Sequence, residues 1–370
     1  MKVIHLPVNI SSQISSTVRA LRALGVDARG LARNQSPLQA HWGIESVDWF
    51  GRPNPAFRLW RGVRWRWKLV RAMVWADVIH WHWGDTTWGE IDLRIAARLR
   101  KPRLVEFWGD DLRDPALASR DNPFLAELYR SQSGPTDFGS TATQKMFRKH
   151  GFAYLVPGYE LADYVDRSIF PGFYQTRPRV LLDDYTPSFP DPARSKPVLA
   201  HAPSNKAKKG TEAVLAALEQ LKPNHNFEFK LIHGMPRSEA LQTVATADVF
   251  LDQFTIGAEG LAALEAMALG KPVVCFIKES LRSRYPEACP IVVSDQNNLA
   301  PTLAKLIENG PRRRALGIEG RKYIERYHSA NEVARELVKV YEHLMIPIKG
   351  STASEPMNCP YWCKVSNQRS

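Results

Sequence analysis

One segment in the C-terminal half of this 370-residue chain reads Gly257-Ala-Glu-Gly-Leu-Ala-Ala-Leu-Glu-Ala-Met-Ala-Leu-Gly-Lys-Pro-Val-Val274. The pattern predicts a glycine-rich turn, a short helix that carries Glu265, and a buried strand that begins at Pro272. The first backbone N–H groups of a helix have no partner within the helix, and they suit an anion. A carboxylate on the same helix can accept hydrogen bonds from paired sugar hydroxyls. The segment therefore predicts a site for a nucleoside diphosphate-sugar.

The segments around it alternate between apolar strands and helical patterns, which is typical of parallel β-α-β units. They are the loop His201-Ala-Pro-Ser-Asn-Lys-Ala-Lys-Lys-Gly-Thr211, the helical pattern Ala213 to Leu221, the strand and turn Phe229 to Pro236, the strand Ala247 to Asp252, and the closing helices Gly320 to Tyr327 and Glu332 to Leu344. In order and spacing, over roughly residues 196 to 345, these segments resemble the retaining glycosyltransferases with the GT-B fold, those of the family-four type.

The resemblance implies roles for residues that match the motifs of that family. A Lys-Gly pair that holds the donor diphosphate matches Lys209 and Gly210. The second Glu of the family signature, which binds the donor ribose, matches Glu265. Gly260 and Leu261 would begin the helix whose N-terminus receives the diphosphate.

The chain departs from the family pattern at two places. The first Glu of the signature, which usually faces the transferred sugar, is replaced by Gly257. Either Glu259 substitutes for it from a shifted loop, or the backbone N–H groups from Gly257 to Leu261 serve alone. Ser204 stands where the family has an arginine that contacts the diphosphate, and Lys206 and Lys208 could supply the missing positive charge.

Length and composition favour two α/β domains. The chain is long enough for two cores, and its 44% hydrophobic and 24% charged residues are typical of a globular protein. We expect the GT-B architecture, in which two doubly wound Rossmann-like domains face each other across a cleft. The expected parts are an acceptor-binding domain (1–185), a proline-rich linker (186–196), a donor-binding domain (197–345) and a flexible tail (346–370).

The N-terminal half offers candidates for the acceptor side. Glu106-Phe-Trp-Gly-Asp-Asp-Leu-Arg113 follows a strand and resembles the His-Gly-Ser-Asp turn of the family, with Trp108 in place of the His. Asp111 then matches the family Asp and is a candidate catalytic residue; alternatively, it caps a helix. Arg113 is suited to an anionic group. His82 shares one face of a strand with His80, and we expect a buried, hydrogen-bonded histidine more than an acceptor-side one.

The segment Arg58 to Trp75 combines four tryptophans with six basic residues, in a chain whose net charge is +12. On a helix, we expect Val63, Trp67, Val70 and Val74 to form a core stripe beside a basic stripe of Arg61, Arg64, Lys68 and Arg71, with Trp65 at its flank. The basic side is either an ordinary solvated surface or an interface with anionic lipid. No recognition motif for nucleic acid accompanies the charge.

We therefore expect a retaining transferase of cell-surface polysaccharide or glycolipid synthesis, with a nucleotide-sugar donor and a carbohydrate or lipid-linked acceptor. No suitably placed Asp-x-Asp motif appears, so a metal or other cofactor is not expected. No membrane-spanning or signal segment is apparent, which favours a cytoplasmic protein, peripheral on the inner face of the membrane. Cys359 and Cys363 have neither zinc nor thioredoxin spacing. The alternative is a non-catalytic sugar-nucleotide-binding relative that serves as a partner protein.

Overall fold

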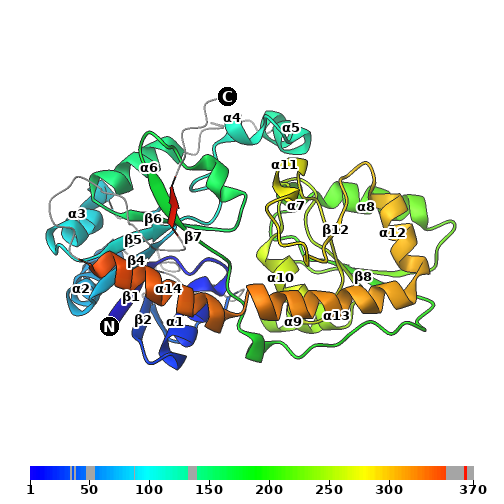
Figure 1. The fold of residues 1–370 in the computed structure, drawn as a ribbon, viewed down its shortest axis with the longest axis horizontal. Coiled ribbons are helices and arrows are strands. Elements are labelled where there is room, and N and C mark those ends of the chain that lie inside the picture. Colours follow the sequence, from blue (N-terminus) through cyan, green and yellow to red (C-terminus); the bar gives the residue numbers. More distant parts are fainter. Residues whose placement is uncertain are drawn as a thin grey trace. The chain divides into compact units, whose positions relative to one another are not determined.

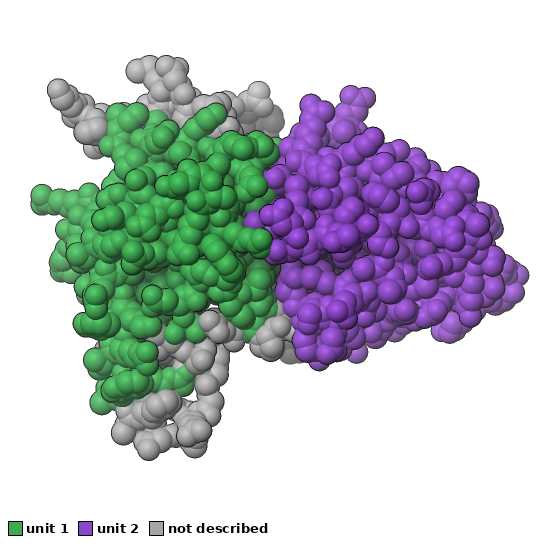
Figure 2. Space-filling model, turned by 90° about the horizontal axis from the view of Figure 1, so that it is seen from below, with its two compact units in different colours: residues 1–114, 137–179, 330–370 green, residues 115–136, 180–329 purple. Residues whose placement is uncertain are grey.

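The computed structural model describes residues 1–33, 36, 39–46, 55–86, 88–131, 140–346 and 362–364. The chain forms two compact units (Figures 1 and 2). Unit 1 comprises residues 1–114, 137–179 and 330–370, and unit 2 comprises residues 115–136 and 180–329.

The division differs from the expected boundaries in three respects. The long segment of unit 2 begins at Val180, directly after Arg179, whereas we expected the first domain to extend to residue 185. Residues 115–136 belong to unit 2, although they lie within the expected first domain. The last helix, α14 (Ala330–Met345), belongs to unit 1 because it packs against the first helix of that unit, α1 (Gln13–Ala23). The chain therefore passes from one unit to the other four times.

Unit 1 contains an eight-stranded sheet with the order β13-β7-β6-β5-β4-β1-β2-β3. All neighbouring strands are parallel except the β13–β7 pair, which is antiparallel. The strands are β1 (Lys2–Pro7), β2 (Asp27–Ala32), β3 (Ile44–Ser46), β4 (Val78–His82), β5 (Arg103–Glu106), β6 (Ala153–Pro157), β7 (Gly172–Thr176) and β13 (Trp362–Lys364). Part of the tail that we expected to be irregular is thus a strand, which pairs Cys363 with Phe173. Cys359 lies outside the described residues.

Helices of unit 1 connect these strands. Besides α1 and α14, they are η1 (Ile10–Ser12), α2 (Pro55–Trp75), η2 (Trp88–Glu90), α3 (Ile91–Arg98), α6 (Ser140–Lys149) and η3 (Leu161–Tyr164). Chain order reverses between β1 and β4, so right-handed crossovers place α1 and α2 on opposite faces of the sheet. The side chain of Asn9 accepts the N–H groups of Ile14 and Ser15 at the start of α1 and so satisfies two backbone donors of its first turn.

The prediction of a core stripe on α2 was wrong. Val63, Trp67 and Val74 are exposed, and the side that packs on unit 1 lies opposite to them. The helix has apolar residues on two sides, and spacing alone cannot tell which side the sheet will cover. The buried side consists of Arg61, Trp65, Leu69 and Met73.

Unit 2 contains a parallel sheet with the order β12-β11-β10-β8-β9. Its strands are β8 (Val198–His201), β9 (Glu228–Leu231), β10 (Val249–Leu251), β11 (Val273–Cys275) and β12 (Val292–Val293). Its helices are α4 (Pro115–Ala118), α5 (Pro123–Ser131), η4 (Leu182–Asp184), α7 (Lys206–Lys209), α8 (Thr211–Leu221), α9 (Arg237–Ala245), α10 (Leu261–Ala268), α11 (Glu279–Arg282), α12 (Leu299–Glu308) and α13 (Gly310–Tyr327).

Both faces of the unit 2 sheet are buried along its central strands, β8, β10 and β11. Alternate residues of β8 enter two separate cores: Val198 and Ala200 pack with α9, α10 and α13, and Leu199 packs with α8 and α12. Continuous apolar runs are what a parallel strand covered on both faces needs, and this explains why these central strands lack a polar side, whereas the edge strand β9 alternates Glu228 and Lys230 with apolar residues. Among the described residues of either unit, no helix has the length and apolar character needed to cross a membrane.

Candidate functional site

The candidate donor site lies at the carboxyl edge of the unit 2 sheet. Chain order reverses between β8 and β10, and ligands of open α/β sheets bind at such a switch point. The loop after β8 leads to Lys209 and Gly210, and the loop after β10 leads to Gly260. The two loops meet: the N–H of Phe254 donates to the carbonyl oxygen of Lys209 at 3.1 Å.

Lys209 reaches the start of α10. Its Nζ lies 2.7 Å from Oδ1 of Asp252, and Oδ2 of Asp252 accepts the N–H of Gly260 at 2.6 Å. A Cβ atom on Gly260 would approach the Lys209 ammonium to 2.5 Å, so a side chain at this N-cap would displace the lysine. The N-cap residue of α10 is Gly260, which has no side chain to cap the helix, so the N–H groups of the first turn suit an anion. The predicted Lys209, Gly260 and Leu261 therefore come together, and Asp252 is a contact that the sequence analysis missed.

Glu265 lies one turn further along α10, and two residues that the sequence analysis missed hold its carboxylate. Its Oε1 accepts the hydroxyl of Tyr185 at 2.8 Å and pairs with the guanidinium of Arg237 at 2.5 Å. Burial, followed by the nearby Glu265 carboxylate, raises the pKa of Tyr185 well above its usual value. Arg237 begins α9, directly after the predicted strand and turn. Its position at the start of a helix that follows a strand is the sequence signal that could have identified it as a site residue.

Gly257 cannot be exchanged for the glutamate of the family signature without strain. Its φ angle is +89°, a conformation that favours glycine. A Cβ atom there would lie 3.1 Å from Nδ2 of Asn122 and 3.3 Å from Cβ of Lys278. The local backbone therefore explains why the first Glu is absent from this chain.

The other predicted donor residues are placed in different ways. The carboxylate of Glu259 accepts a hydrogen bond from the hydroxyl of Tyr285. Ser204 and Lys206 are exposed on the loop after β8 and the first turn of α7. Gly210 has a φ angle of +69° and lies against Phe254 and Thr255, where a Cβ atom would come within 3.1 Å of each.

A segment from the N-terminal half of the sequence supports the donor loop of unit 2. Asn122, which is buried, donates from Nδ2 to the carbonyl oxygens of Thr255 and Ile256, both at 2.8 Å. Next to it, Asp121 pairs with Lys278 at 3.1 Å. These bonds fix the backbone immediately before Gly257. No local sequence signal identifies them, because the partners are more than 130 residues apart in the chain.

In unit 1, Asp111 organises two loops rather than capping a long helix. Its carboxylate accepts the N–H groups of Gly84 at 3.0 Å, Trp108 at 3.0 Å and Gly109 at 2.8 Å. Burial raises the pKa of Asp111 to about 7, against the lowering effect of these backbone bonds. The residue therefore ties the loop after β4 to the loop after β5.

Arg113 is occupied by carboxylates of its own unit. It pairs with both oxygens of Glu160, at 2.8 and 2.9 Å, and with Asp110 at 3.0 Å. The Glu160 carboxylate raises the pKa of the guanidinium against the opposing effect of burial. Nearly all of its surface is buried, so it is a structural ion pair in this structure.

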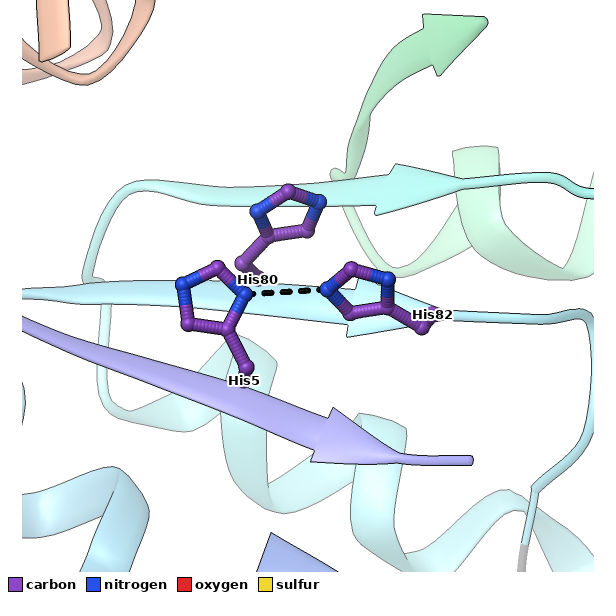
Figure 3. Close-up of side chains that lie close together, drawn as sticks. All are labelled: His5, His80 and His82. Atoms are coloured by element: carbon purple, nitrogen blue, oxygen red, sulfur yellow. Dashed lines mark hydrogen bonds between the residues drawn. The ribbon is translucent and has the colours of Figure 1, made fainter. Parts of the chain in front are cut away.

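His82 belongs to a fully buried group with His5 and His80 at the switch point between β1 and β4. Figure 3 shows the rings of His5 and His82 pointing toward each other, and Nδ1 of His5 lies 2.9 Å from Nε2 of His82. His80 stacks on His82 with the ring centroids 4.2 Å apart. Desolvation, followed by neighbouring charges, lowers the pKa of all three well below 6.5. His82 is therefore a buried, hydrogen-bonded histidine, which is the alternative that we favoured from the sequence.

The three histidines place one nitrogen each within 4.8 Å of one another, which is the spacing of a metal site. Neutral imidazoles are also the form that binds a metal. Two observations oppose a cation there. The guanidinium of Arg179 pairs with both oxygens of Glu106 at 2.6 Å, beside the rings, and its charge lowers the pKa of each histidine. Nδ1 of His5 and Nε2 of His82 are also hydrogen-bonded to each other.

The sequence matches no known protein-family model. None of the curated proteins is significantly similar to it.

Solved structures do resemble the chain. Sucrose-phosphate synthase from Thermosynechococcus elongatus has a TM-score of 0.65 and 14% identity, over 93% of this chain and 99% of that chain. WaaG, a glycosyltransferase involved in lipopolysaccharide biosynthesis, has a TM-score of 0.56 and 14% identity, over 92% and 99%. HepE from Anabaena, solved in complex with UDP, has a TM-score of 0.58 and 12% identity, over 92% and 100%. The chain therefore has the two-domain Rossmann-like fold of the GT-B glycosyltransferases, as expected.

Proposed function

We propose that this chain is a glycosyltransferase that moves a sugar from a nucleoside diphosphate-sugar to an acceptor hydroxyl with retention of configuration. One observation carries the proposal: the Lys209 ammonium lies against Gly260, at the uncapped start of α10, with the Glu265 carboxylate one turn further on. A lysine and a helix N-terminus provide charge for a diphosphate, and a carboxylate one turn along the helix can accept hydrogen bonds from the hydroxyls of the attached ribose.

The same groups explain how transfer would be accelerated. The bond between the anomeric carbon and the diphosphate oxygen breaks, and a bond to the acceptor oxygen forms. Negative charge grows on the leaving diphosphate, where Lys209 and the N–H groups of α10 stabilise it. The proton of the acceptor hydroxyl passes to an oxygen of the departing phosphate, so the chain needs no separate base. Asp252 holds the lysine in position before the donor arrives.

The similarity to HepE, a protein solved with UDP, supports a uridine nucleotide as the first donor to test. We propose a carbohydrate or lipid-linked acceptor of cell-surface polysaccharide or glycolipid synthesis, and a cytoplasmic enzyme peripheral to the membrane. Neither a metal nor another cofactor is part of the proposal. Asp111 is assigned to positioning the acceptor-side loops. Glu259 remains the candidate replacement for the first Glu, and Glu259→Gln tests that role.

The test begins with a panel of nucleotide-sugars in a thermal-shift assay, because a ligand that binds only the folded state raises its stability by mass action. We expect at least one donor to raise the melting temperature. Lys209→Gln and Glu265→Gln should abolish the shift and lower transfer by about 100-fold or more, within the range of removed transition-state donors. Lys222→Gln, an exposed lysine on unit 2, is the matched control.

Two results would contradict the proposal. Normal donor binding and turnover in both site variants would show that the diphosphate binds elsewhere. A donor that binds but is neither transferred nor slowly hydrolysed would favour the non-catalytic alternative.

A further inference from the structure

We propose that the exposed side of α2 and the adjacent cavity form a docking surface for a bilayer that contains anionic phospholipid. The surface is defined by Leu59, Trp60, Val63, Trp67 and Val74, flanked by Arg64, Arg66 and Arg71. The inference rests on the proposed function only for the class of acceptor, since lipid binding itself requires no donor.

The apolar part of this surface is continuous. Each of its five side chains is between 53% and 69% exposed. With about 100° of rotation per residue, the five lie in one arc about 100° wide, opposite to the buried side that contains Trp65 and Leu69. A helix that is apolar on a second, uncovered side leaves hydrophobic surface in water unless a partner covers it.

Basic residues border the arc on both sides. Arg66 lies at one edge, and Arg64 and Arg71 lie at the other. Arg64 lies 5.3 Å from the ring centre of Trp60, and Arg71 lies 4.4 Å from that of Trp67. Tryptophan with arginine around an apolar strip suits the interface of a bilayer, where indole rings lie at the level of the headgroups.

A cavity of about 260 Å³ opens beside the same helix, toward β1 and β2. Arg29 stacks on Trp75 in its wall, at 3.9 Å from the ring centre. Three basic groups and one acidic group line it: Arg29, Lys68, Arg71 and Glu45. Glu45 pairs with Lys68 at 3.0 Å, and Asp27, which does not line the cavity, lies 3.7 Å from Arg29. The lining retains an excess of positive charge, which suits the phosphate of a lipid headgroup.

Charge complementarity decides the occupant. A second copy of the chain would bring the same arginines face to face, which is unfavourable. A neutral bilayer would use the apolar arc but not the arginines or the cavity. An anionic bilayer uses all three features.

The experiment is co-sedimentation of the full chain, without donor, with vesicles of phosphatidylglycerol and phosphatidylcholine or of phosphatidylcholine alone. We expect binding to the anionic vesicles at least ten-fold stronger. Arg64→Gln and Arg71→Gln should each weaken it about five-fold, since a basic residue contributes about 1 kcal/mol near such a surface. Trp67→Ser should weaken it as well, and Arg29→Gln should do so if the cavity holds a headgroup.

Matched controls lie on unit 2, where Arg312→Gln changes an exposed arginine and Leu215→Ser changes an exposed apolar residue. Both should bind like the unchanged chain. Absent binding, equal binding to both kinds of vesicle, or unchanged binding of the Arg64 and Arg71 variants would overturn the proposal. A dimer that Trp67→Ser dissociates, with no vesicle binding, would overturn it in favour of self-association. If vesicles bind but no nucleotide-sugar does, only the proposed function fails.

Discussion

The ammonium of Lys209 and the carboxylate of Asp252 form a part-buried ion pair at 2.7 Å, and the same carboxylate accepts the backbone N–H of Gly260. One aspartate therefore orients both elements proposed to hold the donor diphosphate. A group held in place before the ligand binds loses little conformational freedom on binding.

The first prediction concerns this aspartate. Asp252→Ala should lower the free energy of unfolding by about 3 kcal/mol, since it leaves Lys209 without its carboxylate and the Gly260 N–H without an acceptor. Asp252→Asn retains an acceptor for the Gly260 N–H and should lower the free energy of unfolding less than Asp252→Ala does. Guanidinium titrations measure both. The control Glu279→Ala removes a mostly exposed carboxylate and should change it by about 0.5 kcal/mol or less. Equal losses for Asn and Ala would show that the Gly260 contact contributes nothing.

A second prediction concerns the missing glutamate. Gly257→Ala should destabilise unit 2 by about 1–3 kcal/mol, because a positive φ angle and close neighbours both oppose a Cβ atom. Gly234 has a φ angle of +72° with open space around it, so Gly234→Ala isolates the cost of the backbone conformation alone. Thermal unfolding compares the two variants. If they lose equal stability, the crowding near Asn122 and Lys278 is not the reason for glycine.

A third prediction concerns the partners of Glu265. Arg237→Gln should weaken UDP binding about ten-fold, because the carboxylate loses the ion pair that orients it. Tyr185→Phe removes one neutral hydrogen bond, and its effect should be smaller. Isothermal titration calorimetry measures both, with Arg312→Gln as the exposed control. A larger effect of Tyr185→Phe would assign the orienting role to the hydroxyl.

A fourth prediction makes Asn122 a positioning residue. Asn122→Asp keeps an oxygen for the N–H of Leu125 but removes the donor to Thr255 and Ile256. We expect the KM for the donor to rise about ten-fold, with a smaller change in kcat, since the loop binds the donor in ground and transition states alike. Asn297→Ala, on an exposed loop, is the control. A loss of thermal stability with an unchanged KM would make the role of Asn122 purely structural.

A fifth prediction concerns pH. His5, His80 and His82 have lowered pKa values, so below pH 6.5 the unfolded chain takes up protons that the folded chain does not. The free energy of unfolding then falls with decreasing pH by about 1.4 kcal/mol per pH unit for each histidine. Glu106 and Asp111 have pKa values raised to about 7, so as pH falls from 7 the folded chain takes up protons at these groups before the unfolded chain does. This uptake raises the free energy of unfolding and offsets part of the loss.

The three histidines outnumber the two carboxyl groups, so we expect a net loss of stability from pH 6.5 to 5. Nitrogen-15 shifts of the imidazoles provide the direct check. The three rings should remain neutral at pH 5.5 in the folded chain, whereas the denatured chain should titrate near pH 6.5. A charged ring among the three at pH 5.5 would contradict the assignment.

Local patterns predicted most elements within a few residues. The helical pattern expected at Ala213 to Leu221 lies within α8, and the strand expected at Ala247 to Asp252 contains β10. Such elements follow from hydrophobic periodicity, turn residues and caps, which are local properties of the chain. The loops of Lys209 and Gly260 were predictable for the same reason, because each directly follows a strand.

The amino-acid sequence alone thus determined the alternation of strands and helices, the two α/β sheets and the residues at the start of α10. Only the tertiary structure decided that α14 packs on unit 1, that Asn122 supports the donor loop, that Asp252 and Arg237 hold Lys209 and Glu265, and which side of α2 is buried. The physical reason is distance along the chain. Each of these outcomes depends on contacts between segments tens to hundreds of residues apart, and no local pattern specifies the partner.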